Sequence, residues 1–382
     1  MIDDLARNKQ SGAASDALAI VLTGDVILDV PEPDHWLGGI APAVRAADIA
    51  IGHLEVPHTA RSFELAGDVP APGADPAHLA ALKRAGFAAM TLAGNHIADC
   101  GPAGIADTIE GLNALGIASC GAGADLVTAR RPVLLEHGNR RLAVLSYNCV
   151  GPQNAWAGEA SAGCAYLPVA TADGTPITPP KTLTTPTAEA AHILTQDIAA
   201  VRDQAELVIV ALHKGIVHTP VTVAPYERQL AHMAIDAGAD VVISHHAHII
   251  RGIEFYRGKP VFHGLGNGCV VTHALDPNQS HAGRADWARR RKQLFGFEPD
   301  PAYQLAPFHP QAVNAFLARL VWHADGRLEV GVLPACVDAP GRPRLVTGAE
   351  AESVCQYLER ITREAGLGQL TLQPRDDMVV VG

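Results

Sequence analysis

The sequence predicts an α/β fold in which helices cover layers of parallel and antiparallel strands. Continuous apolar runs that end in polar residues alternate with segments of helical periodicity, which is the pattern of parallel strands joined by helices. Later segments have the form of hairpins, which adds antiparallel strands. No internal repeat is visible in the 382 residues.

The first half of the chain supplies three strand-like runs. Each run is apolar and ends in polar side chains: residues 18–27, 46–56 and 87–96. Residues 75–86 begin with Asp-Pro and end in Gly, which are start and stop signals of a helix, and residues 101–116 have helical periodicity. Residues 131–148 are expected to form a hairpin across Gly138-Asn139.

The second half continues the alternation. Helical periodicity is expected at 187–205 and 225–238, and strands at 206–215 and 239–248. Two further hairpins are expected: 252–267, with a turn at Arg257-Gly258, and 314–335.

Two long segments interrupt this pattern. Residues 151–186 are rich in Gly, Ala, Thr and Pro, and residues 276–312 are first polar and then Pro-rich. Long connections of this kind are often functional. We expect both to be surface excursions that cover the site and select an extended substrate. Residues 1–16 are expected to form a polar tail.

Charge and composition exclude several classes of partner. The net charge of −11 argues against nucleic acid and anionic membranes. The basic run Arg289–Lys292 is expected to be the solvated face of a short helix. No apolar stretch approaches the roughly 20 residues of a membrane span, and the N-terminus does not resemble a signal peptide. Seven scattered cysteines suggest a reducing compartment, so we expect a cytoplasmic protein.

Polar side chains follow the apolar runs at five places. They are Asp25, Glu55, Asn95 with His96, His213, and His246 with His248. Taken singly, each could be an ordinary turn, cap or core residue. Ligand sites of open α/β sheets lie outside the carboxyl ends of strands, so together these groups predict one crevice. Their oxygen and nitrogen donors suit divalent ions, and the lack of cysteine disfavours a structural zinc site.

Several motifs in order carry a family resemblance. "GDVIL", "LE" at 54–55, "GNHIADCGPAGI", "LHKG" and the stretch from "YERQLAHMAIDAG" to "FHGLGN" resemble the CapA (poly-γ-glutamate capsule synthesis) family. That family is a branch of the calcineurin-like metallophosphoesterase fold. The resemblance covers residues 17–335 and leaves 336–382 as a C-terminal extension. It implies a two-layer β-sandwich flanked by helices, with one or two metal ions at the strand ends.

The resemblance also implies roles for individual residues. Asp25 and His248 would bind a first ion, and Glu55 would hold the bridging position. Three ligands would hold the second ion: Asn95, His213 and His246. The ion could be Mn, Zn, Fe, Mg or Ca.

Other residues would assist the ligands. His96, held by Asp99, would be the acid/base or oxyanion partner. His309 is a candidate for a second acid/base group. Further residues expected around the ligands or the substrate are His53, Lys214, His218, His245 and Asn267.

The sequence departs from the phosphoesterase pattern in three places. Val26 and Ile27 follow Asp25 where phosphoesterases have Asp-x-His, so the first ion lacks an imidazole. His53 replaces the usual Asn before Leu-Glu, and Ser244 replaces the Gly before the paired histidines. These departures put dinuclear phosphomonoester hydrolysis in doubt.

Two classes of function follow from these observations. The first is a metal-dependent enzyme, either a phosphoester or amide hydrolase or an enzyme that inverts a Cα in a peptide or polyglutamyl chain. The stretches "HKGIVHTP" and "FHP" resemble peptide epimerases of ribosomal (lasso) peptides, which favours inversion. The second class is a non-catalytic accessory protein of capsule synthesis. The expected partner is a peptide or small-molecule substrate. The oligomeric state is left open.

Overall fold

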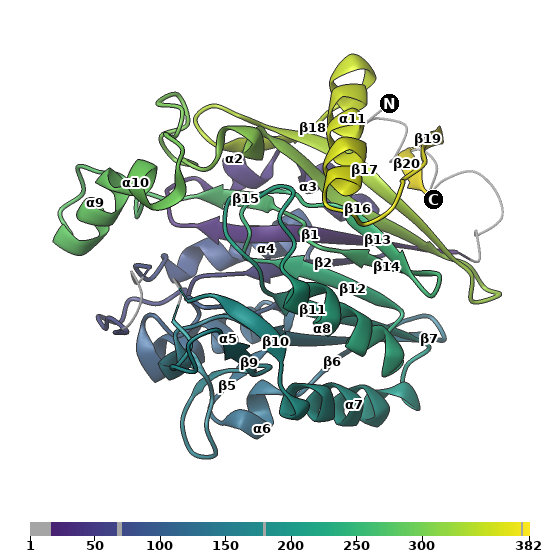
Figure 1. Ribbon diagram of the computed structural model, residues 1–382, viewed down its shortest axis with the longest axis horizontal. Coiled ribbons are helices and arrows are strands. Elements are labelled where there is room, and N and C mark those ends of the chain that lie inside the picture. The colour runs from purple at the N-terminus through teal and green to yellow at the C-terminus, as the bar shows by residue number, and fades with distance from the viewer. Residues whose placement is uncertain (1–16, 67–70, 179–180, 376) are drawn as a thin grey trace.

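Two β-sheets lie face to face in the computed structural model, with helices on the outer faces (Figure 1). The structure describes residues 17–66, 71–178, 181–375 and 377–382. The N-terminal tail expected at 1–16 therefore lies outside the described residues. The two-layer α/β sandwich expected from the sequence is confirmed.

The first sheet has ten strands. Its strand order is β19-β20-β17-β16-β1-β2-β3-β4, with β15 also on β1 and β18 on β17. The bounds are β1 Leu18–Leu28, β2 Ile49–Leu54, β3 Ala89–Thr91, β4 Ala118–Cys120, β15 Asn267–Val271, β16 Asn314–Trp322, β17 Leu328–Asp338, β18 Arg342–Leu345, β19 Leu372–Arg375 and β20 Met378–Val381.

The second sheet has six strands in the order β13-β14-β12-β11-β7-β6. The bounds are β6 Val133–His137, β7 Arg140–Asn148, β11 Leu207–His213, β12 Val241–His245, β13 Ile253–Tyr256 and β14 Lys259–Phe262. All three hairpins expected from the sequence are present, as β6–β7, β13–β14 and β16–β17. Small two-stranded sheets pair β5 (Ala122–Gly123) with β8 (Gly163–Cys164) and β9 (Val169–Thr171) with β10 (Leu183–Pro186).

The two large sheets share an inner apolar core. Alternate side chains of β1, such as Ile20 and Leu22, meet Val144, Ile209 and Ile243 of the second sheet in one buried cluster. Burying each such side chain contributes roughly 1.5–3 kcal/mol, so this layer holds the strand ends in fixed register. The register matters because it places the site.

Helices cover the outer faces. The helix bounds are α2 Pro33–Leu37, α3 Ala41–Ala46, α4 Leu79–Ala85, α5 Gly101–Ala114, α6 Leu126–Ala129, α7 Ala188–Arg202, α8 Pro225–Asp236, α9 Ala282–Arg289, α10 Arg291–Phe295 and α11 Gly348–Glu364. The four helices expected from the sequence are present as α4, α5, α7 and α8. Asp75 caps the short 3₁₀ turn before α4 by accepting the N–H of Ala77 at 2.8 Å. Among the described residues, no helix is long and apolar enough to cross a bilayer.

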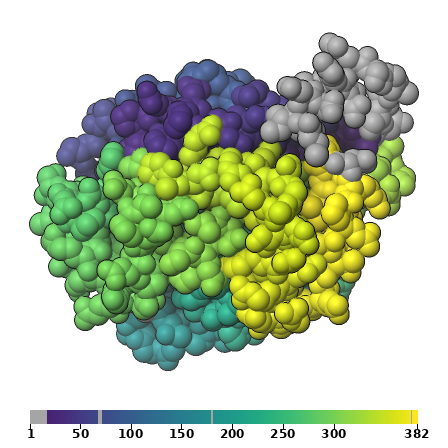
Figure 2. Space-filling model, turned by 90° about the horizontal axis from the view of Figure 1, so that it is seen from above, coloured from purple at the N-terminus to yellow at the C-terminus, as the bar shows by residue number. Residues whose placement is uncertain are grey.

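The C-terminal residues complete the first sheet and do not form a separate extension. The boundary expected at residue 335 cuts through β17, and β20 pairs with that same strand. The buried side of α11, which includes Tyr357, Leu358 and Ile361, belongs to the inner core cluster. In the space-filling view this yellow segment is continuous with its neighbours (Figure 2). The apolar face of α11 is stable only when it packs against a sheet. This is why the C-terminal residues join the domain and do not form the separate extension that the sequence suggested.

The two excursions behave differently. Ala157, Leu167, Val169 and Ile177 from the first excursion are buried in the apolar cluster that lies under α7 and α8. Much of residues 151–186 is therefore part of the core, which differs from the expected lid. The second excursion carries α9 and α10, which stand out from the body of the molecule (Figure 1).

Candidate metal centre

Strand register brings the predicted polar residues to one edge. Asp25 on β1 lies opposite His53 on β2 and Asn267 on β15. In the second sheet, His213 ends β11 opposite His245 at the end of β12. These strands run parallel, so their carboxyl ends meet at the same edge.

A close backbone approach shapes this edge at Gly24. A Cβ at this position would lie 2.0 Å from the carbonyl oxygen of Gly266. Only glycine fits there. The register between β1 and β2 shifts between Leu22 and Asp25, which turns the Asp25 carboxylate into the site.

Oxygen donors dominate one side of the site, which we call the oxygen-rich lobe (Asp25, Glu55, His248 and Asn267). His248 Nε2 lies 3.3 Å from Glu55 Oε1, and His248 Nδ1 lies 3.6 Å from Asp25 Oδ2 and 3.0 Å from Asn267 Oδ1. Asp25, Glu55 and His248 can each offer a ligand atom to one ion. Carboxylate and amide oxygens suit hard divalent ions.

Imidazoles dominate the other side, which we call the nitrogen-rich lobe (His53, His213, His246 and Asn95). His213 Nε2 lies 2.8 Å from Asn95 Oδ1 and 3.1 Å from His246 Nδ1. His53 and His213 form a second possible ligand group with Asp25. Asp25 is therefore common to both groups, whereas the resemblance implied Glu55 for the shared position. His53, expected beside the ligands, lies among them.

Buried polar atoms without partners show that the residues fit a bound cation. Nε2 of His53, Nδ1 of His213 and Oε2 of Glu55 are buried and lack a hydrogen bond among the described residues, while Glu55 Oε1 pairs with His248 Nε2 at 3.3 Å. Leaving such atoms unpaired costs roughly 1–3 kcal/mol each, more if charged. A Cβ on Gly94 would lie 3.2 Å from His53 Nε2 and 3.4 Å from His213 Nδ1, so glycine keeps the space between them open.

Electrostatics separate the two carboxylates of the oxygen-rich lobe. Burial raises the pKa of Asp25 well above its usual range, and nearby Glu55 raises it further. For Glu55, burial also acts to raise the pKa, but His248 outweighs it and the pKa falls to about 2. Burial acts to lower the pKa of His248, but Glu55 and Asp25 raise it to about 9. A divalent cation would replace the His248 charge beside the carboxylates.

The imidazoles of the nitrogen-rich lobe are held neutral. Burial lowers the pKa of His53 and His213 well below the usual range, and neighbouring imidazoles lower it further. Burial and His248 lower the pKa of His246 to about 3. Metal ligands must carry an unprotonated nitrogen, so these side chains are ready to bind at neutral pH.

Three histidines at the site have left-handed backbone. The φ angle is 88° at His246, 53° at His248 and 61° at His218. Such conformations cost of order 1–3 kcal/mol each and cluster at functional sites. They let His246 reach the nitrogen-rich lobe and His248 the oxygen-rich lobe, although the two stand only two residues apart.

The proposed acid/base residue His96 is oriented as expected. Its Nδ1 lies 2.6 Å from Asp99 Oδ2, which selects the tautomer with the lone pair on Nε2. Asp99 Oδ2 also accepts the N–H of Ala71 at 2.5 Å. The charge of a protonated His96 acts to lower the pKa of both Asp25 and Glu55, and His96 directly follows the candidate ligand Asn95 in the chain.

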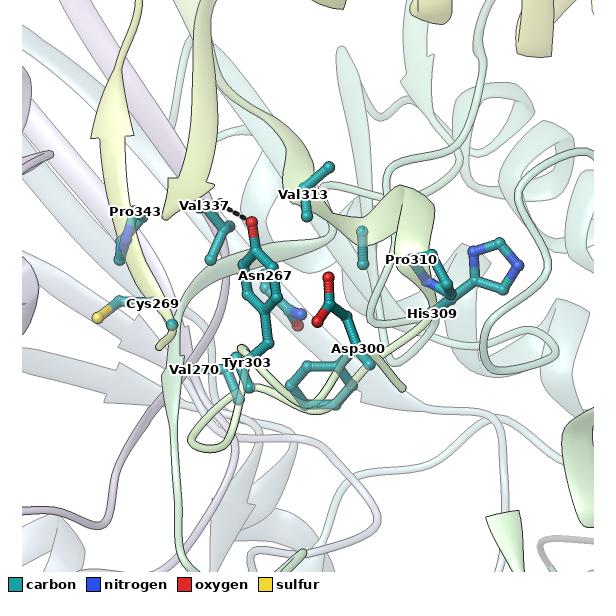
Figure 3. Close-up of a pocket in the computed structure, with 14 residues that line it drawn as sticks. Asn267, Cys269, Val270, Asp300, Tyr303, His309, Pro310, Val313, Val337 and Pro343 are labelled. Atoms are coloured by element: carbon teal, nitrogen blue, oxygen red, sulfur yellow. Dashed lines mark hydrogen bonds between the residues drawn. The ribbon is translucent and has the colours of Figure 1, made fainter. Parts of the chain in front are cut away.

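His309 sits further from the ligands and caps a short helix. Its Nδ1 accepts the N–H of Gln311 at 3.1 Å, which leaves the proton of the neutral ring on Nε2. Its ring centroid is 5.0 Å from that of Phe297, and burial lowers its pKa. His309 lines one end of a cavity of about 280 Å³, and its ring points out of that cavity (Figure 3). Asn267 also lines this cavity, which therefore adjoins the oxygen-rich lobe.

Three other predicted residues differ in their position relative to the ligands. The ring of His245 stacks on His53 at 4.5 Å, and its Nε2 lies 3.2 Å from the carbonyl oxygen of Thr23. Lys214 is fully buried and its Nζ lies 3.3 Å from Glu227, so it belongs to a structural ion pair away from the ligands. The His218 ring centroid lies 6.2 Å from that of His248, at the rim.

Sequence reasoning missed three contributors. Thr91 Oγ1 lies 3.0 Å from His53 Nδ1 and orients that ring, and Phe308 stacks on His248 at 4.8 Å. Arg291 was expected on a solvated face but is 2% exposed. Thr91 lies inside the apolar run 87–96, before its polar end at Asn95 and His96, so its position in the sequence does not single it out. No sequence signal distinguishes Arg291 from the other three residues of its basic run.

Comparison with known proteins identifies the family. The family model described as "Bacterial capsule synthesis protein PGA_cap" matches residues 19–270. The chain belongs to the PGA_cap family. The matched range contains both lobes, so the resemblance to CapA proteins is confirmed.

The chain is also similar to two curated bacterial proteins and, more distantly, to one solved structure. A Mycobacterium tuberculosis protein named "probable polyglutamine synthesis accessory protein" is 30% identical over 282 residues, 72% of this chain and 68% of that protein. The capsule biosynthesis protein CapA of Bacillus anthracis is 25% identical over 268 residues, 66% of this chain and 60% of that protein. A calcineurin-like phosphoesterase of Bacillus subtilis aligns at 13% identity with a TM-score of 0.35, over 92% of this chain and 98% of that one.

Proposed function

We propose that this PGA_cap protein is a metal-dependent enzyme that removes and returns a Cα proton in a peptide or polyglutamyl chain. The observation that carries the proposal is the His96–Asp99 pair beside two groups of buried, partly unpaired ligand atoms. When bound, a divalent ion would act as a Lewis acid on a substrate carbonyl. Asp25, Glu55 and His248 would hold one ion, and His53, His213, His246 and Asn95 a second.

His96 would be the base. Asp99 fixes the ring through Nδ1, so the lone pair on Nε2 can take a proton and give it back. A base oriented in this way typically contributes about 10²–10⁴-fold to the rate.

The surroundings of the oxygen-rich lobe favour Cα chemistry over phosphoester hydrolysis. Ile27 stands where phosphoesterases of this fold place a second imidazole, and it packs with Val56 and Phe308 in a buried apolar cluster. This wall suits a peptide side chain better than a phosphate dianion. Inversion also needs a second proton carrier, and we assign this role to His309. The neutral His309 must exchange its contact with Gln311 for a proton before it can act as an acid.

Deuterium exchange tests the proposal. Metal-loaded protein is incubated with a panel of peptides and γ-linked glutamyl chains in deuterated buffer, and mass spectrometry and chiral analysis follow. We expect deuterium at one Cα together with inversion. His96→Ala should lose about 10²–10⁴-fold in exchange, whereas His309→Ala should lose inversion but keep one-sided exchange. His192→Ala, at a position on α7 away from the metal centre, is the matched control.

A phosphoester or amide hydrolase is the second candidate. The same His96–Asp99 pair could protonate a leaving group, and a divalent ion, when bound by the two ligand groups, would make water more acidic near neutral pH. Phosphate or amine release without deuterium at Cα would establish this alternative. An accessory role without catalysis fits the name of the Mycobacterium relative, and it would be favoured if His96→Ala left every measured activity of the capsule system unchanged.

A further inference from the structure

Arg291 is an unpaired charge buried beside the metal centre. It is 2% exposed, and Nε and both terminal nitrogens have no hydrogen-bond partner among the described residues. Burial lowers its pKa to about 10, and no neighbouring charge among the described residues offsets this effect. A guanidinium has five N–H donors, and burying it unpaired costs several kcal/mol. The free protein therefore holds a cation that lacks its counterion.

Aromatic rings surround the guanidinium. Its central carbon lies 5.2 Å from the ring centroid of Trp287, 5.9 Å from Phe297 and 5.7 Å from Phe308. Such cation–π contacts attract the guanidinium but leave its in-plane N–H groups unused. The rings hold the cation in place without neutralising it.

The same rings connect Arg291 to the metal ligands. Phe308 stacks on His248 at 4.8 Å and also lies 5.9 Å from the ring centroid of His218. His218 Nδ1 is buried and has no hydrogen-bond partner among the described residues. Arg291 and His218, two polar groups without hydrogen-bond partners on the atoms named above, thus both lie next to the ring of Phe308. The same ring stacks on His248, a predicted metal ligand.

We propose that Arg291, with His218, binds a carboxylate of the substrate next to the residue that reacts at the metal centre. This inference rests on the proposed function, because it names the substrate group that the same site recognises. It gives the second excursion a specific role, since residues 276–312 carry Arg291 and its aromatic cage to the oxygen-rich lobe. A γ-linked glutamyl chain carries such a carboxylate on every residue.

The charge balance favours a carboxylate over a phosphate. One guanidinium neutralises one negative charge, and its planar fork matches the two oxygens of a carboxylate. A phosphate dianion would leave one charge uncompensated among Trp287, Phe297 and Phe308. These three rings all come from the second excursion, whose helices α9 and α10 stand out from the body of the molecule (Figure 1).

Calorimetric binding to metal-loaded protein tests this proposal. The probes are tri-γ-glutamate, the same peptide with its carboxylates converted to amides, and inorganic phosphate. Arg291→Met keeps the apolar stem but removes the charge, and Arg291→Lys keeps the charge but loses the fork. The matched control is Arg290→Met, because Arg290 is exposed and forms an ion pair with the exposed Asp286 of α9 at 2.9 Å.

We expect Arg291→Met to weaken tri-γ-glutamate binding by about 10- to 100-fold, with a smaller loss in Arg291→Lys and none in Arg290→Met. The amide probe and phosphate should change less than about twofold between wild type and Arg291→Met. The melting temperature of Arg291→Met should be equal or higher, because an unpaired buried charge has been removed.

Several results would overturn the proposal. They are an unchanged affinity for tri-γ-glutamate in Arg291→Met, a larger loss for phosphate than for the peptide, or loss of bound metal in Arg291→Met but not in Arg290→Met, which would make the residue structural. A different result would reject the proposed Cα chemistry without rejecting the carboxylate site. If no probe exchanges its Cα proton but Arg291→Met still loses affinity for the carboxylate peptide, the reaction is wrong and the binding site stands.

Discussion

The two lobes of the candidate metal centre share one carboxylate but differ in almost every other respect. The oxygen-rich lobe places Glu55 and Asn267 around Asp25 with a single imidazole, and the nitrogen-rich lobe gathers the imidazoles of His53, His213 and His246. Burial lowers the pKa of the imidazoles on the nitrogen-rich side, whereas the carboxylates raise that of His248 to about 9 on the other.

This difference predicts two unlike ions. Oxygen donors favour Mg, Mn or Ca, and neutral imidazoles favour Zn or Fe. The nitrogen-rich lobe is also better ordered before metal arrives, since His53 is fixed by Thr91 and stacked on His245. Arg291 lies nearer the oxygen-rich lobe, because Phe308 contacts both Arg291 and His248.

The largest effect is expected where the lobes meet. Asp25 belongs to both candidate ligand groups, so Asp25→Asn should lower the content of both ions below about a tenth of an equivalent. Elemental analysis measures this. Asp29→Asn on the same chain segment is the control, because Asp29 accepts a hydrogen bond from Thr272 at 2.8 Å and is absent from the ligand groups. Retention of one full equivalent in Asp25→Asn would show that the carboxylate is not shared.

Single-lobe variants should separate the two ions. Glu55→Gln should release the ion of the oxygen-rich lobe and leave the other bound, and His213→Ala should do the reverse. Each change removes a ligand from one lobe only. Metal titration followed by native mass spectrometry reports the stoichiometry. If either variant loses both ions together, the lobes form one site and the comparison fails.

A smaller effect is expected from the residue that orients His53. Thr91→Val keeps the shape of the side chain but removes the hydroxyl that lies 3.0 Å from His53 Nδ1. Affinity in the nitrogen-rich lobe should fall about 10-fold, in the range measured for groups behind metal ligands. Affinity in the oxygen-rich lobe should stay the same, and an equal loss in both lobes would contradict the separation.

Much of the fold was predictable from local pattern. Asp75 and Gly86 mark the limits of a helical segment, and the apolar runs of β1, β2 and β11 are buried strands with polar ends. The features that could not be predicted from local pattern depend on packing between segments far apart in the sequence. The apolar residues between 157 and 177 carry no helix or strand periodicity, so only the structure places them in the core. The same holds for α11, whose apolar face has meaning only against the first sheet.

The sequence was enough to predict which residues form the candidate site, but not how their side chains are arranged in it. Residues that end parallel strands must share an edge, so Asp25, Glu55 and His213 could be grouped from sequence. Sharing depends on side-chain distances, which assign Asp25 and not Glu55 to both groups. Arg291 was out of reach, because burial of one residue in a basic run depends on rings that are brought together only in the folded excursion.

The most direct test of the two-lobe account is a competition between two metals. Apoprotein is given equimolar Zn²⁺ and Mn²⁺ and desalted, and the bound metals are measured by elemental analysis and native mass spectrometry. The account predicts one zinc and one manganese per chain, with zinc lost in His213→Ala and manganese lost in Glu55→Gln. The account is contradicted if the wild-type chain binds a single ion or two ions of the same metal. It is also contradicted if His213→Ala and Glu55→Gln lose the same metal.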